Sequence, residues 1–184
     1  DPNHMVSTGN EGFMGCEQDM ALCEQVNDCP YVDYITIHIW PYNWSWVSSD
    51  SVNDGVEAAV EKVNEYIDRH IELAGKLGKS VVIEEFGYPR DGFVFTPGSA
   101  TCGRDRIYDC VFSRVVESAA GKGRLAGCNF WGWGGRAQVK NVIWQPYDDY
   151  VCDPAQEEQG LNSVFASDTS TLQLIRDMAL APVC

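Results

Sequence analysis

The stretch Ser80-Val81-Val82-Ile83-Glu84-Glu85-Phe86-Gly87-Tyr88-Pro89 decides how the chain is expected to fold. Its β-branched run predicts a buried strand, which the glycine and proline at its end terminate. Two carboxylates at the end of a buried strand are costly unless they have partners or a chemical task. Because side chains alternate across a strand, we expect Glu84 and Glu85 to point to opposite faces. On that alternation Glu85 shares the interior face with Val81 and Ile83, where it is either an ion-paired or a functional group.

Strands and helices alternate along the rest of the chain. Apolar patterns predict strands at 4–8, 34–40 and 125–131, a weak helix at 20–22, and helices at 56–77 (capped by Asn53 or Asp54 and ended by Gly78), 105–120 and 170–179. This alternation is typical of a parallel sheet with right-handed crossovers. A (β/α)8 TIM barrel has eight strands and typically about 250 residues. Residues 1–184, with four predicted strands, are therefore expected to form the second half of such a barrel.

The composition narrows the class of partner. The net charge is -14, from 13 basic and 27 acidic residues. This charge argues against nucleic acid and against anionic membrane surfaces as partners. No apolar run approaches the roughly 20 residues that a membrane helix needs. A neutral ligand fits better, and the six Trp and eight Tyr are suited to stacking on the apolar faces of sugar rings.

The cysteine pattern suggests an oxidising environment. Eight cysteines, an even number, predict disulfides in a secreted protein, with buried free thiols as the alternative reading. The sequence does not choose among the pairings. No C-x-x-C pair occurs and the three histidines are scattered, so we expect no metal site and no cofactor. Asn43-Trp44-Ser45 has the form of a glycosylation site, but its place in a predicted binding loop argues against an attached glycan.

Three side chains with chemical potential stand at the C-terminal ends of predicted strands. They are His38, Glu85 and Trp131. In a (β/α)8 barrel this rim is where catalytic residues gather. His70, in contrast, lies on the apolar face of the predicted helix 56–77, and we expect it to be a packed histidine.

Five motifs in the expected order resemble glycoside hydrolase family 5, and within it the endo-β-1,4-mannanases. Val82-Ile83-Glu84-Glu85-Phe86-Gly87 is similar to strand seven of that family's barrel, and Phe130-Trp131 is similar to strand eight. The other matching stretches are 3–13 (strand five), 33–41 (strand six) and 159–165 (the tail). The resemblance covers nearly the whole chain and implies strands five to eight of the barrel.

The resemblance also implies roles for individual residues. Glu85 would be the nucleophile that forms a glycosyl-enzyme intermediate. His38 would line the cleavage subsite, Trp131 would stack beneath the distorted sugar ring, and Glu11 would contact sugars on the leaving-group side. Trp40 stands where many members have a tyrosine that hydrogen-bonds to the nucleophile, and its indole N–H is a possible replacement donor.

One part of the family's machinery has no counterpart here. The family takes its general acid/base from an Asn-Glu pair at the end of strand four, whereas Asn10-Glu11 lies in surroundings that match strand five. Retaining hydrolysis needs two carboxyl groups about 5 Å apart. The resemblance therefore implies a secreted mannanase that acts on mannan together with the N-terminal half of the barrel. Two alternatives remain: a β-1,4-glucanase of the same family, and a non-catalytic carbohydrate-binding half-barrel.

Overall fold

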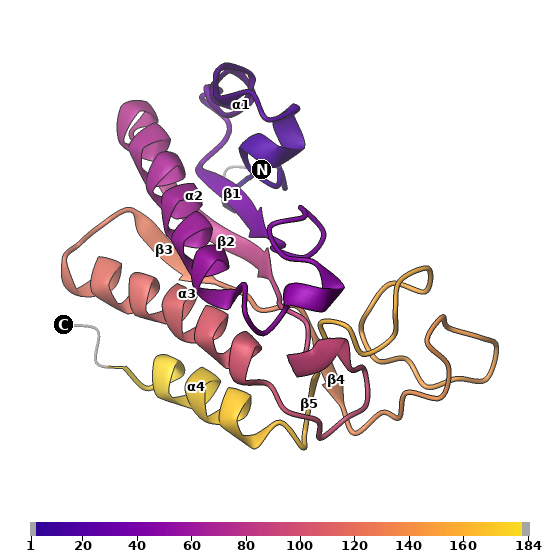
Figure 1. Cartoon of the computed structure of the whole chain (residues 1–184). Helices are drawn as coiled ribbons and strands as arrows, with labels where there is room; N and C mark the ends of the chain where they lie inside the picture. The colour runs from indigo at the N-terminus through magenta and orange to yellow at the C-terminus, as the bar shows by residue number, and fades with distance from the viewer. Residues whose placement is uncertain (1–2, 182–184) are drawn as a thin grey trace.

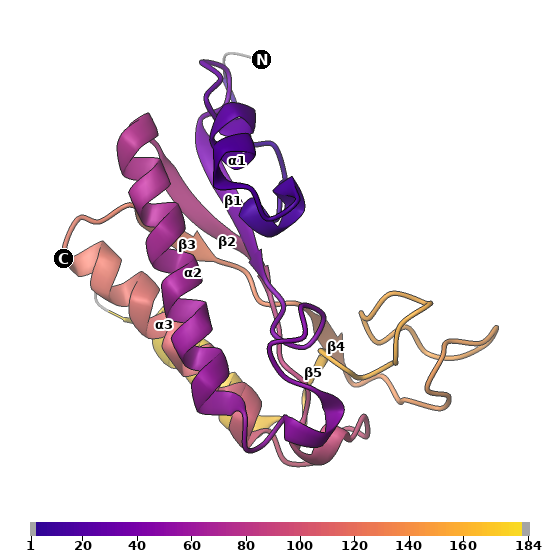
Figure 2. The same cartoon turned by 45° about the horizontal axis from the view of Figure 1, so that its top comes forward.

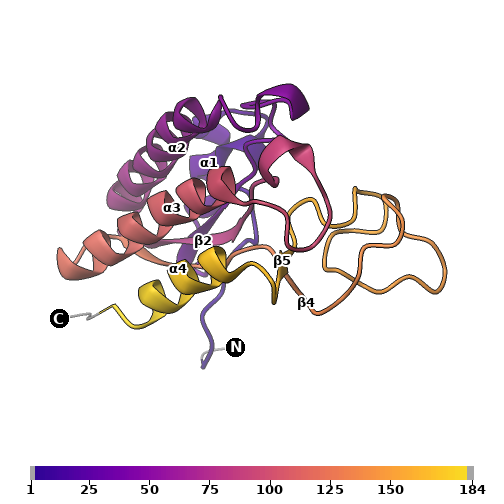
Figure 3. The same cartoon turned by 60° about the horizontal axis from the view of Figure 1, so that its bottom comes forward.

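The computed structural model describes residues 3–181, in which three parallel strands form the central sheet. Helix α2 (Val56–Leu77) connects the first strand to the second, and α3 (Cys102–Ala120) connects the second to the third. Both helices, with α4 (Thr169–Ala179) beside α3, lie on one side of the sheet (Figure 1 and Figure 3). The strands, in sheet order, are β1 (Tyr34–Ile39), β2 (Ser80–Phe86) and β3 (Leu125–Cys128). The predicted parallel βα alternation is thus confirmed.

Shorter elements surround this unit (Figure 2). The weak helix predicted at 20–22 is the start of α1, and Asp19 caps it by accepting a hydrogen bond from the Ala21 N–H at 2.8 Å. A second, two-stranded parallel sheet pairs β4 with β5 and was not predicted. The short elements are η1 (Phe13–Cys16), α1 (Met20–Asn27), η2 (Ser49–Ser51), η3 (Asp91–Phe93), β4 (Trp133–Gly135) and β5 (Val164–Phe165).

The strand predicted at 4–8 does not form. Residues 4–11 run beside β1 and make isolated backbone bonds, from Asp33 N to Val6 O at 2.8 Å and from His38 N to Glu11 O at 3.1 Å. This segment has no further strand on its outer side among the described residues, and Met5 is 78% exposed. Within residues 3–181 the segment therefore has a hydrogen-bonding neighbour on one side only, β1, and it stays irregular.

The strand predicted at 125–131 is shorter but keeps its direction. The regular part, β3, ends at Cys128. The backbone still follows β2 beyond that point, because Asn129 N bonds to Ile83 O and Trp131 N bonds to Phe86 O, both at 2.8 Å. Trp131 therefore lies next to the end of β2, as the prediction required.

Helix α2 forms as its apolar periodicity predicts, but its expected N-cap is wrong. Gly55 occupies the N-cap position, and the Asn53 side chain accepts a hydrogen bond from Gly92 N at 2.6 Å. Asn53 therefore links the turn before α2 to the loop before α3, and no side chain of the described residues caps the N-terminus of α2. The predicted end is confirmed, because Gly78 closes the helix in the left-handed region at φ 69°.

The apolar core lies between the sheet and its helices. The side chains of β1 and β2 that face the helices are fully buried, and they pack on one stripe each of α2 and α3. These strand residues are Ile35, Ile37, Ile39, Val81 and Ile83. Burial of this kind contributes about 2 kcal/mol for each large aliphatic side chain, which makes the helix-covered face the stable part of the fold.

A buried polar cluster anchors the end of the chain to the loop after β2. Asp168, at the N-terminus of α4, pairs with the Arg90 guanidinium, and both side chains have 0% exposure. Arg104 on α3 donates to three backbone carbonyls, those of Tyr88, Leu161 and Ser163. Asp168 occupies the N-cap position of α4, as its residue type predicts, but its carboxylate turns inward to this ion pair and makes no capping hydrogen bond.

The sheet is open within the described part of the chain. Three of the four strands expected from the sequence form, so the edges of β1 and β3 have no regular strand beside them. A closed (β/α)8 barrel needs eight parallel strands. What is present is a partial α/β unit with parallel strands, consistent with half of such a barrel.

Seven of the eight cysteines lie within residues 3–181. All seven cysteines in that range carry free thiols, so the predicted disulfides are not formed there. Cys110, for example, is buried on α3, and its Sγ accepts a hydrogen bond from the Asn64 side-chain amide at 3.4 Å. None of the helices in this range combines the length and apolar character needed to cross a membrane.

His70 is a packed histidine, as predicted, and it is held in its neutral form. Its Nδ1–H donates to the Tyr66 carbonyl at 2.8 Å, and its Nε2 accepts from the Phe13 N–H at 3.0 Å. A proton on Nε2 would set two hydrogen-bond donors, Nε2–H and the Phe13 N–H, against each other, which disfavours the charged ring. Burial lowers the pKa of His70 to about 4.

The pKa of His70 predicts acid-sensitive stability. The unfolded chain binds a proton near pH 6.5 whereas the folded chain does so near 4, so the stability held at neutral pH is lost as pH falls between these values. We expect this residue to account for about 3 kcal/mol of that loss. Urea unfolding at pH 7 and pH 4.5, compared between wild type and His70→Gln, measures it. Equal pH dependence in both proteins would contradict the prediction.

Candidate active site

A β-bulge shapes the end of β2. Ile37 pairs with Ile83, but the next residue, His38, pairs with Glu85, so Glu84 is an extra residue in the ladder. A bulge of this kind lets two successive side chains avoid strict alternation. Both Glu84 and Glu85 consequently reach the same imidazole.

The contacts of His38 correct the predicted orientation of the carboxylates. His38 Nδ1 lies 3.2 Å from Glu85 Oε2, and His38 Nε2 lies 3.7 Å from Glu84 Oε2. Ile83, which was expected to share a face with Glu85, is fully buried against the helices. The expectation that Glu84 and Glu85 face opposite ways is wrong, because the bulge resets the alternation after Ile83. Glu85 still stands at the C-terminal end of β2, where the sequence placed it.

A hollow of about 270 Å³ lies at the C-terminal ends of the strands. Four residues predicted for the site line it together, and the fifth, His38, does not line it but contacts Glu85. The four are Glu11, Trp40, Glu85 and Trp131. The structure therefore brings together side chains from three strand ends and the turn before β1.

The two predicted tryptophans stand edge to face. The ring centroids of Trp40 and Trp131 are 6.3 Å apart, and the ring planes cross at 77°. Gly87 permits this position, because a Cβ there would lie 2.8 Å from Cζ3 of Trp40. Two large apolar rings beside a carboxylate form a surface suited to a sugar ring.

Glu11 is positioned through its backbone. Its carbonyl accepts hydrogen bonds from the Tyr66 hydroxyl at 2.5 Å and from the His38 N–H at 3.1 Å. The preceding residue is fixed as well, because the Thr36 hydroxyl donates to the Asn10 carbonyl at 2.8 Å. Its side chain thus lines the hollow while α2 and β1 hold the turn.

Opposing influences act on the ionisation of Glu85. Burial raises the pKa of its carboxyl above the ordinary value, and His38 opposes that rise. The charges of Glu84 and Glu11 raise the pKa further, and a hydrogen bond from Trp40 lowers it. This influence supports the Trp40 indole as a donor to Glu85, and its role stays a prediction. Glu85, at 28% exposure, is a partly desolvated carboxylate beside the imidazole of His38.

A family model described as GH family 5 beta-mannosidase-like matches residues 1–182. The chain belongs to glycoside hydrolase family 5. Mannan endo-1,4-beta-mannosidase 7 of Arabidopsis thaliana is 28% identical over an alignment of 188 positions, which covers 96% of this chain and 40% of that protein. The family 5 mannosidase of Rhizomucor miehei is 30% identical, with a TM-score of 0.84 over 96% of this chain and 43% of that one.

A further solved structure supports the fold alone. The endo-1,4-beta-mannanase of Rhizomucor miehei is 21% identical, with a TM-score of 0.53 over 97% of this chain and 42% of that one. This family 5 chain thus spans about two fifths of the length of the relatives it matches. Its strands therefore correspond to part of the family's (β/α)8 barrel, as the sequence predicted.

Four more residues line the hollow, of which two come from the predicted binding loop and two were not predicted. The hollow is also lined by Asn43, Trp44, Pro154 and Glu157. Asn43 and Trp44 follow β1 in an aromatic-rich segment, which is a usable signal. Glu157 belongs to the long loop 136–163, where nothing in the local sequence marks it. Burial raises the pKa of the Glu157 carboxyl, and the charge of Asp153 adds to that rise.

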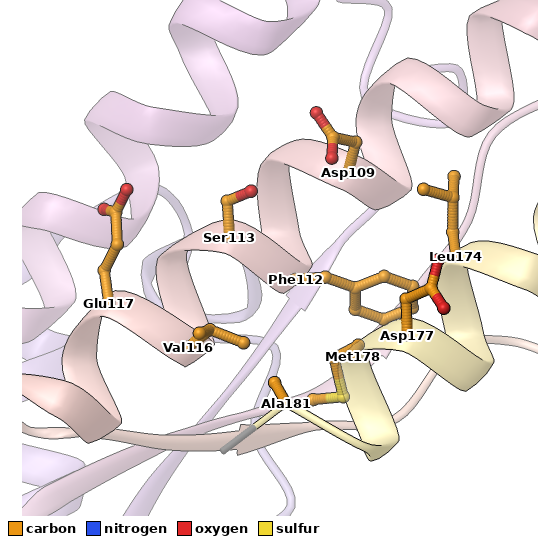
Figure 4. Close-up of a pocket in the computed structure, with 9 residues that line it drawn as sticks. All are labelled: Asp109, Phe112, Ser113, Val116, Glu117, Leu174, Asp177, Met178 and Ala181. Carbon is orange, nitrogen blue, oxygen red and sulfur yellow. The ribbon is translucent and has the colours of Figure 1, made fainter. Parts of the chain in front are cut away.

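A second hollow, between α3 and α4, is unlike the first (Figure 4). Phe112, Leu174 and Met178 form its apolar part, and Asp109 and Asp177 stand at its rim. It lies on the helix layer, away from the strand ends that carry His38 and Glu85. Its lining holds neither an imidazole nor a tryptophan, so we assign no part of the family 5 chemistry to it.

Among the described residues, no group of three or more His, Cys, Asp or Glu side chains is placed to hold a metal ion.

The contact between His38 and Glu85 predicts a measurable titration effect. His38→Ala removes the group that opposes the burial effect on Glu85, so we expect the pKa of Glu85 to rise further above its ordinary value. Carboxyl ¹³C NMR titration of the wild type and the variant checks this, with Glu85→Gln identifying the signal. An unchanged or lower pKa in His38→Ala would count against the proposed contact.

Proposed function

We propose that the chain is the C-terminal half of the catalytic domain of a retaining endo-β-1,4-mannanase, with Glu85 as its nucleophile. One observation carries the proposal: Glu85 lines a hollow shared with Trp40 and Trp131 and contacts His38 at 3.2 Å. The family 5 membership and the endo-mannosidase relative support the reaction class and the substrate, mannan or galactomannan. No cofactor is needed for this chemistry.

The mechanism divides the reaction between two steps. Glu85 attacks the anomeric carbon and forms a glycosyl-enzyme ester, while the bond to the leaving sugar oxygen breaks and that oxygen takes a proton from a carboxylic acid. A water molecule then displaces Glu85, and the second carboxyl group accepts the water's proton. Trp131 stacks beneath the reacting sugar, His38 and Trp40 orient Glu85, and Glu11 contacts the leaving-group side.

The second carboxyl group belongs, in this proposal, to the N-terminal half of the barrel. Strands one to four would pair with the open sheet edges and place the general acid/base about 5 Å from Glu85. The edge of β3 supports such a partner, because exposed strand edges are templates for pairing, and so does the side of β1 that holds only the irregular segment 4–11. The N-terminal half is thus both a structural and a catalytic partner.

The decisive experiment measures hydrolysis by the barrel completed with the N-terminal half. We expect reducing sugars to be released from galactomannan and not from carboxymethyl-cellulose, and this chain alone to release none. Hydrolysis of carboxymethyl-cellulose instead would favour a β-1,4-glucanase. Binding of mannan without hydrolysis by the completed barrel would favour a non-catalytic carbohydrate-binding half-barrel.

A second candidate, a mannosidase acting on chain ends, is favoured by one observation. The TM-score is 0.84 against the Rhizomucor miehei mannosidase and 0.53 against the endo-mannanase of the same organism. The product pattern from reduced mannohexaose separates the two. An endo-acting enzyme releases oligosaccharides of several lengths from the start, whereas an end-acting enzyme releases mannose first.

We further propose that the protein is secreted, because the polymeric substrate proposed for it, mannan, lies outside cells. Fractionation of a culture of the source cells tests this. The protein is expected in the medium or the cell-wall fraction, and its confinement to the cytosol would refute the proposal.

A further inference from the structure

The bulge in β2 places the His38 ring between two successive carboxylates. Nδ1 faces Glu85 Oε2 at 3.2 Å, and Nε2 faces Glu84 Oε2 at 3.7 Å. The imidazole is 12% exposed, while Glu84 and Glu85 are 35% and 28% exposed. Each nitrogen of the ring therefore has a carboxylate of its own, from adjacent residues of one strand. The mechanism described above uses only one of these two contacts.

The Nε2 nitrogen of His38 lacks a hydrogen bond in the described part of the chain. His38 Nε2 is buried and has no hydrogen-bond partner within the described residues. A buried polar atom without a partner costs about 1–3 kcal/mol. Glu84 Oε2, at 3.7 Å, is just beyond hydrogen-bond distance and is the acidic group that faces this atom. A small movement of Glu84 would complete the bond.

We propose that Glu84 is a positioning residue, which anchors Nε2 of His38 so that Nδ1 stays directed at Glu85. This inference rests on the proposed role of Glu85 as the nucleophile. The bulge supplies the reason for two consecutive glutamates, because only a break in alternation lets both reach one ring. Without Glu84, the ring keeps a single anchor and rotates more freely about its side-chain bonds.

The expected effect of removing Glu84 follows from its contact with His38, because Glu84 acts on the reaction only through that ring. Where a histidine binds a metal, removal of the group that orients its ring typically lowers activity by about 10-fold to 100-fold, and we expect the same scale for the ring of His38. Glu84 does not line the hollow that Glu11, Trp40 and Trp131 share with Glu85. Its loss is therefore expected to lower kcat and to leave KM for mannohexaose nearly unchanged.

The test compares Glu84→Ala and Glu84→Gln in the barrel completed with the N-terminal half. Glu84→Ala is expected to lower kcat by about 10-fold to 100-fold. Glu84→Gln is expected to recover most of that loss, because an amide can donate to or accept from Nε2. Glu61→Gln removes one negative charge from an exposed position on α2 and serves as the matched control with unchanged activity. Thermal unfolding of each protein shows whether any loss comes from instability.

A second measurement is independent of activity. The ¹⁵N shifts of the His38 ring report hydrogen bonding at each nitrogen, and the His38→Ala spectrum identifies them. Glu84→Ala is expected to move the Nε2 signal, while Glu84→Gln and Glu61→Gln leave it near its wild-type position. Wild-type kcat in Glu84→Ala, or an unmoved Nε2 signal, would overturn the proposal. Equal losses in Ala and Gln variants with a lower melting temperature would show a structural role instead. If the wild-type barrel cleaves no mannan, the proposed function fails, and the ring shifts still decide the role of Glu84.

Discussion

Replacing Glu85 by alanine is expected to lower kcat on galactomannan by at least about 10,000-fold in the completed barrel, which is the scale seen when a covalent nucleophile is removed. The physical reason is that no other carboxylate takes over the attack on the anomeric carbon from this position. Affinity for mannohexaose is expected to remain, because Trp40 and Trp131 keep the surface on which sugars stack. Initial rates and equilibrium binding measured on the same preparations check both halves of the prediction.

A chemical rescue makes this test specific for a nucleophile. In Glu85→Ala, azide can occupy the space left by the carboxylate and attack the anomeric carbon of an aryl β-mannoside, expelling the phenolate. A double-displacement enzyme then produces an α-mannosyl azide, whose configuration NMR identifies. Rescue is not expected for Glu61→Gln, which should retain wild-type hydrolysis. Full activity in Glu85→Ala would exclude this residue, and its neighbour Glu84 in the bulge would become the first candidate.

The sequence was enough to predict which residues of the site lie at the ends of strands. The carboxyl ends of parallel strands meet at one edge of a sheet, so placing His38, Glu85 and Trp131 after three strands was enough to predict their proximity. The orientation of Glu84 was not predictable in this way. A bulge is set by the pairing of His38 with Glu85 across two strands, and strict alternation within one strand does not reveal it.

Other errors share a physical origin in long-range contacts. Asn53 has the residue type of a helix cap, yet its side chain binds Gly92 instead. Asp168 does occupy the N-cap position of α4, but its side chain binds Arg90. Local sequence shows that a side chain is able to cap, but the partner that takes it is distant in the chain. Glu157 illustrates the same limit, because a long loop brings it to the hollow and no periodic pattern marks it. The helix-covered core was predictable because amphipathic periodicity is local.

Replacing Asp168 by alanine is expected to destabilise the fold by about 3–5 kcal/mol, because it leaves a buried guanidinium without its counter-ion. Arg90 Nη1 bonds to Asp168 Oδ1 at 3.0 Å, and Nη2 bonds to Oδ2 at 2.5 Å, with both side chains at 0% exposure. Arg104 Nη1 lies 3.7 Å from the same carboxylate, so two cations lose one partner. Urea unfolding followed by circular dichroism measures the change in the free energy of unfolding.

Two comparisons separate the cost of an orphaned charge from other causes. Glu57→Ala breaks the exposed pair with Arg106 and is expected to cost less than about 1 kcal/mol. The double variant Arg90→Met with Asp168→Leu removes both charges of the buried pair and is expected to recover part of the loss seen in Asp168→Ala. A double variant less stable than Asp168→Ala would show that the ion pair itself, rather than the avoidance of an unpaired charge, stabilises this region. Because Arg104 also holds the Tyr88 carbonyl, two residues after the last residue of β2, loss of this cluster is expected to loosen the end of β2 that presents Glu85.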